Sequence, residues 1–248
     1  MNLEQAIKNK TRQKLYVSLA LRPGRTGTRF YTRLFEYHNI DAEYVACQCI
    51  DIKKDIELAK QHCAGISITM PYKTKVTEFV DFWHGSKGIA NTLHLQLGVV
   101  TAYNCDESAL RACVKFTKSQ MSINLLGMGA MSQNFRNIAP KDSIIRQFGR
   151  ANWMHRVQPC DMLVNATSIG MNPGESPMAD VHNAHAVVDV VQGPTRLKKI
   201  ARQAGIPLVT GEQLYIEQFM QQFKVYTGIA PDSVVVKQVA QEVFDYDY

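Results

Sequence analysis

Apolar and small polar residues alternate over residues 67–73 (Ser-Ile-Thr-Met-Pro-Tyr-Lys) and lead into a proline. Alternation with a period of two is typical of a β-strand, and proline ends a strand because it has no N–H to donate. Lys73 lies just beyond, at the carboxyl edge of the expected sheet, where ligands bind in open α/β proteins. This position makes Lys73 a candidate acid or base, although an ordinary solvated lysine shows the same pattern.

The apolar pattern before residue 106 switches repeatedly between the strand period and the helix period. Strands are expected at 15–21, 43–49 and 66–70, and a hairpin is expected from strands 89–96 and 99–103. Helices are expected at 28–39, 51–63, 73–80 and 107–118, with Thr28, Asp51 and Asp106 as N-cap residues. Strands that alternate with helices predict a parallel α/β layer.

The second half of the chain contains the entry to a dinucleotide-binding unit. The apolar strand 122–126 runs into Gly127-Met128-Gly129, and a helix follows from Ala130. Glycines close a tight turn and let backbone N–H groups approach a pyrophosphate at the helix N-terminus. The third glycine of the full pattern is absent, so this motif alone is a weak signal.

This second half is short for a complete nucleotide-binding lobe. Further strands are expected at 143–148, 161–165, 186–191 and 207–209, and helices at 194–204, 211–227 and 232–245. Only about a dozen residues separate strand 143–148 from strand 161–165, which is barely enough for a parallel crossover. We therefore expect one helix-strand unit of this lobe to be missing.

Composition and charge restrict the class of protein. The 248 residues are 46% hydrophobic and 20% charged, as in globular proteins that are soluble. The net charge of +6 comes from scattered basic residues, and no basic run is interleaved with aromatics, so we expect no nucleic-acid partner. The excess suits a small anionic substrate or a phosphate-bearing cofactor.

The same counts bear on compartment and metals. No apolar run is long enough to cross a bilayer, and the polar residues 1–14 do not form a signal peptide. The six cysteines form no CxxC pair and have no zinc spacing, so we expect no metal site. We expect a cytoplasmic protein without a membrane partner, as a monomer or homodimer.

Five motifs in the right order resemble those of the shikimate dehydrogenase family, and more closely its shikimate-dehydrogenase-like branch. Residues 67–73 are similar to N-V-T-x-P-[FY]-K, 89–93 to A-x-N-T-L, 103–106 to G-x-N-T-D, 161–171 to D-L-[IL]-[IV]-N-A-T-x-x-G-M, and 211–218 to G-x-x-M-L-x-x-Q. The resemblance extends from about Leu15 to Tyr226, which is nearly the whole chain.

The resemblance implies an α/β enzyme with two lobes. Residues 1–105 would form a mixed and parallel α/β substrate-binding lobe, and residues 106–209 a truncated Rossmann-like nucleotide-binding lobe. Residues 210–248 would be helices that pack back on the first lobe. The implied reaction is hydride transfer between NADP, or NAD, and a small anionic cyclic hydroxy or keto acid such as shikimate or quinate.

The resemblance also implies roles for individual residues. Lys73 and Asp106 would be the catalytic pair, since oxidising an alcohol needs a base that a nearby carboxylate can orient. The substrate would contact Thr26, Thr28, Ser67, Thr69, Asn91 and Gln218. The cofactor would contact Gly127, Gly129, Ala130, Met131, Arg146, Arg150, Asn165, Thr167, Met171 and Gly211. The alternatives are an N-cap for Asp106, a turn residue for Asn91 and an exposed helix position for Gln218.

Three departures from the family pattern leave the function open. Arg25-Thr26-Gly27-Thr28 stands where the family uses Ser-x-Ser to bind the substrate carboxylate, so the acid itself can differ from shikimate. Cys105 replaces a threonine before Asp106. The shortened lobe has only Arg146 and Arg150 near the place of the family's 2′-phosphate arginine. A binding or regulatory protein without cofactor, and a lyase or dehydratase that uses Lys73 and Asp106, therefore remain alternatives.

Overall fold

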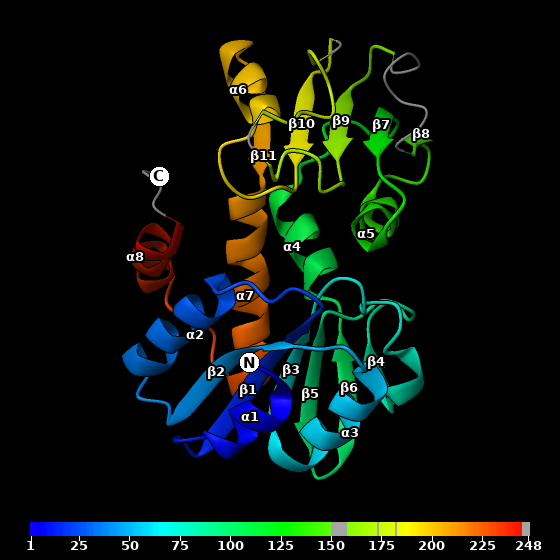
Figure 1. The fold of residues 1–248 in the computed structure, drawn as a ribbon. Helices are drawn as coiled ribbons and strands as arrows, with labels where there is room; N and C mark the ends of the chain where they lie inside the picture. Colours follow the sequence, from blue (N-terminus) through cyan, green and yellow to red (C-terminus); the bar gives the residue numbers. More distant parts are fainter. Residues whose placement is uncertain (150–157, 173, 182, 245–248) are drawn as a thin grey trace. The chain divides into compact units, whose positions relative to one another are not determined.

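The computed structural model describes residues 1–149, 158–172, 174–181 and 183–244. The chain divides into two compact units, which are described one at a time (Figure 1). Unit 1 contains Met1–Cys105 and Gln218–Tyr248, and unit 2 contains Asp106–Glu217. No helix of the described residues has the length and apolarity needed to cross a membrane.

Unit 1 is built on a mixed sheet with the strand order β2-β1-β3-β5-β6-β4. Its strands are β1 (Lys14–Ala20), β2 (Ala42–Gln48), β3 (Gly65–Ile68), β4 (Phe82–His84), β5 (Thr92–Gln96) and β6 (Val99–Tyr103). β1 is parallel to β2 and β3, whereas β5 is antiparallel to both β3 and β6. This arrangement confirms the predicted mixed and parallel α/β lobe.

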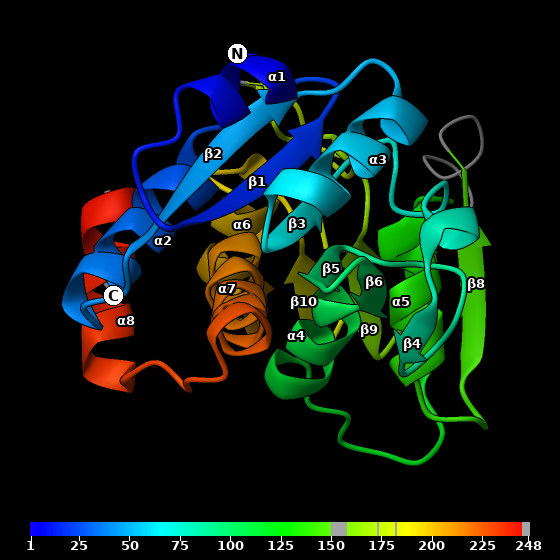
Figure 2. The same ribbon diagram turned by 90° about the horizontal axis from the view of Figure 1, so that it is seen from below.

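Helices cover both faces of this sheet (Figure 2). They are α1 (Leu3–Lys8), α2 (Thr26–Tyr37), α3 (Ile52–His62), α8 (Ser233–Phe244) and the C-terminal half of α7 (Gly211–Thr227). α1 and α3 pack on the face formed by alternate apolar residues of β1, such as Val17 and Leu19. The opposite face of β1 carries Tyr16, whose ring lies 4.7 Å from that of Tyr226 in α7. Helix α8 and the part of α7 from Gln218 onward thus belong to unit 1, whereas the start of α7, up to Glu217, belongs to unit 2.

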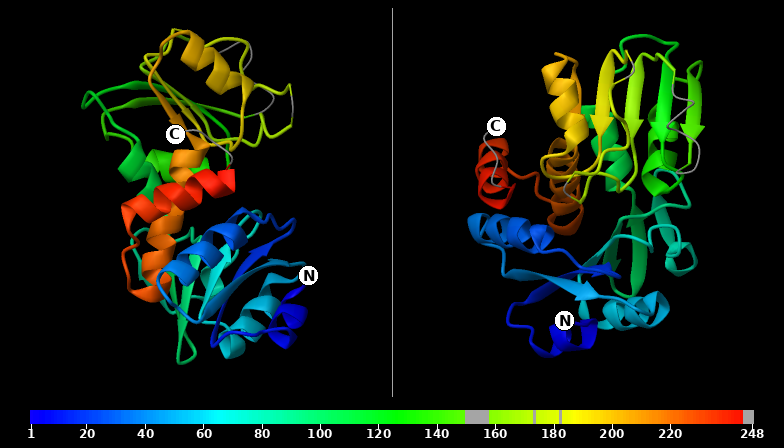
Figure 3. Two further views of the ribbon diagram at one scale, coloured as in Figure 1. Left: turned by 90° about the vertical axis from the view of Figure 1, so that its left-hand side faces the viewer. Right: turned by 45° about the horizontal axis from the view of Figure 1, so that its top comes forward.

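Unit 2 is an all-parallel sheet with the strand order β11-β10-β9-β7-β8 (Figure 3, right). Its strands are β7 (Ser122–Leu126), β8 (Ile144–Phe148), β9 (Met162–Asn165), β10 (Ala186–Asp189) and β11 (Leu208–Thr210), and its helices include α4 (Cys105–Cys113), α5 (Ala130–Ile138) and α6 (Arg196–Gln203). Alternate residues of β7 point into two apolar clusters. Leu125 packs with Phe135 of α5, and Leu126 packs in the cluster that contains Leu197 of α6.

Among the described residues, the order of these strands is that of a Rossmann sheet without its third strand. A full sheet has the order 3-2-1-4-5-6, in which β7 takes place 1, β8 place 2 and β9 place 4. β8 is the edge strand of the described sheet, and residues 149 and 158–161 are neither helix nor strand. The predicted shortened Rossmann-like lobe is therefore confirmed.

The helices α2 and α4 each begin earlier than predicted. α2 begins at Thr26 with Arg25 as its N-cap, so Thr28 lies in the first turn and does not cap the helix. α4 begins at Cys105, which makes Asp106 its second residue and not an N-cap, and it ends at Cys113. The structure thus removes the alternative that Asp106 is the N-cap of this helix.

The predicted helix at 73–80 was wrong. This segment forms turns and a short 3₁₀ helix, η1 (Thr77–Phe79), and β4 follows it. Val76 is fully buried and Tyr72 is 5% exposed, so both side chains are drawn into the core of unit 1. Tertiary burial of these two residues overrides the helical spacing.

Candidate active site and cofactor site

Four segments of unit 1 meet at one edge of its sheet: the residues after β1, after β3 and after β6, and those before β5. β1 and β3 run in the same direction, so the residues that follow each strand lie at this edge. β5 runs the opposite way and begins here, with Asn91 directly before it. Backbone bonds fix the assembly, because Ala90 N donates to Lys73 O at 3.0 Å and Asn91 N donates to Tyr103 O at 3.2 Å. Lys73, Thr69 and Asn91 therefore lie at a common edge.

Asn91 carries a buried amide with an unused donor group. The residue is 1% exposed. Its Oδ1 accepts hydrogen bonds from Cys105 N at 2.9 Å and from Thr92 Oγ1 at 2.8 Å. Its Nδ2 has no hydrogen-bond partner among the described residues. A buried amide nitrogen without a partner is costly, and a ligand oxygen would satisfy it.

Gln222 of α7 lies beside Asn91 and is fully buried. Its Nε2 donates to Asn91 O at 3.1 Å and to Thr92 Oγ1 at 2.7 Å. Its Oε1 accepts from Tyr31 OH at 2.7 Å and from Gln218 Nε2 at 3.2 Å. The predicted substrate residue Gln218 is thus linked to Asn91 through a second glutamine, which the sequence analysis missed.

The hydroxyl of Ser67 is hydrogen-bonded to a buried tyrosine. It is 7% exposed, and its Oγ lies 2.8 Å from Tyr226 OH. Burial raises the pKa of the neighbouring Tyr44 to about 12. These hydroxyls stay protonated at neutral pH. The geometry gives Ser67 a structural role beneath the edge, and its contact with substrate stays a prediction.

The N-terminus of α2 places Thr26 and Thr28 at the same edge, after β1. No side-chain hydrogen bond caps this helix within the described part of the chain, and its N-cap is Arg25. A Cβ added to Gly27 would lie 3.3 Å from Cε1 of Tyr44, so the helix start packs closely on that ring. Uncapped N–H groups, two hydroxyls and an arginine form an environment that favours an anion.

Lys73 and Asp106 fall in different units. Lys73 is partly exposed, at the edge of unit 1. Asp106 is 3% exposed and is the first residue of unit 2. It directly follows Cys105, whose N–H is bonded to Asn91 within unit 1. The predicted catalytic pair stays a prediction.

In unit 2, Gly127 and Gly129 shape the turn between β7 and α5. Gly127 has φ +116°, and a Cβ there would lie 2.9 Å from Ala166 O, so only glycine fits. A Cβ on Gly129 would meet no described atom within 4 Å, and no side chain caps α5 in that part of the chain. Ser132, in the first turn of α5, is fully buried, and its Oγ has no hydrogen-bond partner among the residues that the structure describes. Open space before an uncapped helix is the geometry that binds a phosphate.

The loop after β9 is held by its own side chains. Asn165 is fully buried, and its Nδ2 donates to Ile169 O at 3.1 Å and to Asp189 Oδ1 at 2.9 Å. Its Oδ1 accepts from Thr167 Oγ1 at 2.7 Å and from Thr167 N at 3.2 Å. Burial raises the pKa of Asp189. Asn165 and Thr167, predicted to contact the cofactor, are used here to fix the loop.

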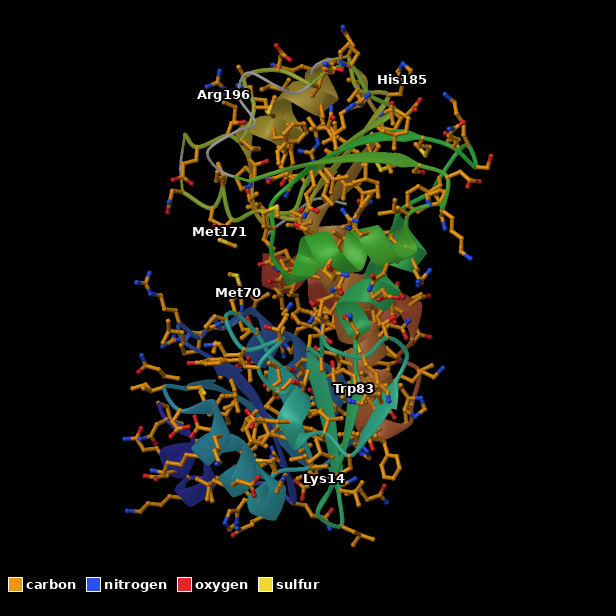
Figure 4. The ribbon with its side chains drawn as sticks, turned by 90° about the vertical axis from the view of Figure 1, so that its right-hand side faces the viewer. Lys14, Met70, Trp83, Met171, His185 and Arg196 are labelled. Carbon is orange, nitrogen blue, oxygen red and sulfur yellow. The ribbon has the colours of Figure 1, made fainter. Side chains whose placement is uncertain are left out.

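The remaining residues predicted to contact the cofactor lie in the loop after β9 and at the starts of α5 and α7. Met171 is 58% exposed and projects from the loop after β9 (Figure 4). That loop is hollowed on its surface by a pocket lined by Ser168, Ile169, Met171, Asn172, Gly174, Glu175 and Ser176. Ala130 and Met131 are the first residues of α5. A Cβ at Gly211 would lie 2.3 Å from Val191 O, so Gly211 allows α7 to begin against that backbone.

Arg146 and Arg150 are the two arginines expected near a 2′-phosphate, and the structure describes only Arg146. Arg146 lies in the middle of β8, opposite Asn124, and its Nη1 is buried without a described partner. Arg146 thus lies within the edge strand β8 and not in the loop after it, and its contact with the cofactor stays a prediction. Arg150 lies outside the described residues.

Two further residues missed in the sequence form a buried clamp in unit 2. Lys198 Nζ lies 2.8 Å from Glu212 Oε1, and both side chains are less than 10% exposed. Lys198 Nζ also donates to Gly193 O, and Gly193 N donates to Glu212. The pair therefore holds the loop after β10 to the start of α7. A sequence signal for it is the unusual lysine at an apolar position of α6.

Known proteins were compared with this chain. The sequence model of the shikimate dehydrogenase substrate binding domain matches residues 27–93. A shikimate dehydrogenase (NADP(+)) of Pyrococcus abyssi is 29% identical over 240 residues, with 86% of this chain and 91% of that protein covered. A shikimate dehydrogenase-like protein of Haemophilus influenzae is 27% identical, with 92% and 95% covered.

The fold agrees with these matches. A solved structure of a shikimate 5-dehydrogenase-like protein superposes with a TM-score of 0.81 at 24% identity, and the match covers 94% of this chain and 98% of that chain. The predicted resemblance is therefore confirmed: over nearly its whole length, this chain is similar to shikimate dehydrogenases and shikimate-dehydrogenase-like proteins.

Proposed function

We propose that this protein is an NADP(H)-dependent dehydrogenase of the shikimate dehydrogenase type. Its reaction would transfer a hydride between the nicotinamide and a ring carbon of a small cyclic hydroxy or keto acid. Shikimate is the first candidate substrate, since the curated relatives are named for it, and quinate is the next. The catalytic pair would be Lys73 and Asp106.

One observation carries this proposal more than any other. The amide of Asn91 is 1% exposed, and its Nδ2 lacks a partner among the described residues. It lies at the sheet edge where Lys73 follows β3, within the segment 27–93 that matches a substrate-binding domain. A buried donor next to a candidate base suits a hydroxyl-bearing ring, because the hydroxyl oxygen would accept from Asn91.

Lys73 would act as the acid and base. In the direction of oxidation, its neutral amine would take the hydroxyl proton as the hydride leaves, and in reduction its ammonium would return that proton. Asp106 would orient the amine and stabilise its charged form. The carboxylate of the substrate would bind at the start of α2, near Arg25, Thr26 and Thr28.

The residues of unit 2 fit a dinucleotide. The nicotinamide, when bound, supplies the hydride acceptor and donor. Gly127 and Gly129 leave room for a pyrophosphate, and the N–H groups at Ala130 and Met131 begin an uncapped helix. NADP is proposed over NAD because the Pyrococcus relative is a shikimate dehydrogenase (NADP(+)). Arg146 and Arg150 are the residues predicted to meet its 2′-phosphate.

The test is a titration of the purified protein with NADPH and NADP⁺, followed by fluorescence and by melting temperature. We expect binding tighter than about 100 μM, in the usual range for enzyme cofactors. Gly129→Glu would place a carboxylate in the open space before α5 and should abolish this binding without unfolding the protein. Gly24→Glu, at an equally open position in unit 1, should have no effect on cofactor binding. If neither fluorescence nor melting temperature changes at millimolar concentrations of either nucleotide, the proposal is wrong.

The shortened sheet supports a second candidate function. β8 is an edge strand, and adenosine normally lies against the part of the fold that follows it. A protein that binds the acid but no cofactor would keep the unit 1 edge alone. Binding of shikimate together with complete absence of nucleotide binding would favour this alternative.

A further inference from the structure

We propose that Gln222 is a positioning residue that fixes the amide of Asn91, so that this edge of the unit 1 sheet offers a hydrogen-bond donor to a hydroxyl oxygen of the substrate. The inference deepens the proposed function and depends on it for the identity of the substrate. Gln222 itself is fully buried and is not assigned a contact with substrate.

Two backbone groups determine the direction of both amides. Asn91 O is a carbonyl and can only accept, so the Gln222 atom that faces it at 3.1 Å must be the amide nitrogen. Cys105 N–H can only donate, so the Asn91 atom that faces it at 2.9 Å must be the amide oxygen. Turning over the Asn91 amide would leave the buried N–H of Cys105 without this acceptor. Turning over the Gln222 amide would place its oxygen against the carbonyl of Asn91, which already accepts from Ile68 N at 2.8 Å.

Thr92 connects the two amides. Its Oγ1 accepts from Gln222 Nε2 at 2.7 Å and donates its own hydrogen to Asn91 Oδ1 at 2.8 Å, which is a stronger acceptor than Cys105 Sγ at 3.3 Å. Asn91 Oδ1 then receives two hydrogens, one from Thr92 and one from Cys105. The oxygen is saturated, and the NH₂ group of Asn91 is left for a ligand.

The oxygen side of Gln222 sets the direction of Gln218. Gln222 Oε1 accepts from Tyr31 OH at 2.7 Å and from Gln218 Nε2 at 3.2 Å. Gln218 lies one turn earlier on the same face of α7, and its nitrogen is turned toward Gln222. Its Oε1 is the remaining acceptor. Asn91 thus offers a donor and Gln218 an acceptor, a combination that hydroxyl groups satisfy and a carboxylate does not.

The experiment uses four variants of the full-length protein. Gln222→Met and Thr92→Val remove the link at two points, and Thr92→Ser retains the hydroxyl. Gln61→Met is the control, because it makes the same glutamine-to-methionine change at an exposed position of α3. Affinity for shikimate is measured by calorimetry. Amide hydrogen exchange of Cys105 is measured relative to Leu19 of β1, which corrects for changes in global stability.

We expect Gln222→Met and Thr92→Val to weaken shikimate binding about tenfold or more, because a lost buried hydrogen bond is worth about that factor. The Michaelis constant should rise more than the turnover number falls, because Asn91 binds and does not react. Exchange at Cys105 should accelerate about tenfold in both variants. Thr92→Ser should restore most of the affinity, and Gln61→Met should behave as the wild type.

Two results would overturn the inference. One is unchanged Cys105 exchange in Gln222→Met, which would show that Gln222 does not hold the Asn91 amide. The other is affinity for shikimate within twofold of the wild type in both link variants. If the wild type binds no shikimate while Gln222→Met still accelerates Cys105 exchange, the proposed substrate fails and the positioning of Asn91 by Gln222 stands.

Discussion

Lys73 is the residue on which the proposed chemistry depends most. Replacing it with methionine keeps the length of the side chain and removes the proton-transferring amine. We expect Lys73→Met to lower turnover by a factor of about 10² to 10⁴, the usual contribution of a general acid or base. Nucleotide affinity should stay within about twofold, because the cofactor is assigned to unit 2.

Lys75→Met is the matched control. Lys75 is exposed two residues later, with its Nζ 5.9 Å from the centre of the Tyr72 ring. Its replacement should leave turnover unchanged. If the two lysine variants lose equal activity, or if Lys73→Met loses cofactor binding as well, the role given to Lys73 is wrong.

Gly127 and Gly129 permit a second comparison between neighbouring residues. Gly127→Ala should reduce the free energy of unfolding by about 1–3 kcal/mol, because φ is +116° and Ala166 O blocks a Cβ. Gly129→Ala should cost less than about 1 kcal/mol, since φ there is −92° and the space is open among the described residues. Urea unfolding of both variants is the measurement. Equal losses would contradict the geometry of this turn.

At the scale of elements, the ion pair between α6 and α7 is a structural clamp. Glu212→Gln would leave the buried ammonium of Lys198 without its counter-charge, and we expect a loss of about 3–5 kcal/mol in stability. Glu4→Gln breaks the exposed pair of Glu4 with Lys54 and should change little. Chemical denaturation distinguishes the two. A Glu212→Gln variant as stable as Glu4→Gln would show that the clamp is not needed.

The starts of β7 and β9 are joined by Asp161, and the contact is pH-dependent. Lys118 and the backbone N–H of Ser122 hold the pKa of this carboxyl well below its ordinary value. The unfolded chain binds the proton more tightly, so the stabilisation is present above the ordinary value and is lost as the pH falls through the folded-state value.

Asp161→Asn should therefore destabilise the protein by about 1–2 kcal/mol near neutral pH, and by less at about pH 3. Asp142→Asn, at an exposed position before β8, should show neither effect. Urea unfolding at the two pH values measures both. A difference between wild type and Asp161→Asn that grows on acidification would contradict the assigned direction.

The elements that sequence predicted best are those with strong local signals. Asp51 caps α3 by accepting from Lys53 N and Lys54 N, as its position suggested. The glycine turn after β7 also lies where the motif placed it. The segment 73–80 was misjudged because burial of Tyr72 and Val76, and not local periodicity, decides its path.

At the scale of the whole molecule, motif order predicted the two lobes and the shortened Rossmann sheet, but not the polar network in unit 1. That network joins Tyr31, Thr92 and Gln222, which are far apart in the sequence. A glutamine four residues after Gln218 was a helical-spacing signal for one member. Tyr31 gave no such signal, because it lies among the buried aromatic and apolar residues of α2.

The most direct test of the central claim is turnover of shikimate with NADP⁺, followed by the absorbance of NADPH. We predict that NADPH appears in equal amount to the ketone product with the wild type and with Lys75→Met, and that it does not appear with Lys73→Met. A wild-type protein that binds shikimate and NADP⁺ but forms no NADPH from shikimate or quinate would contradict the claim that it is a dehydrogenase of this type.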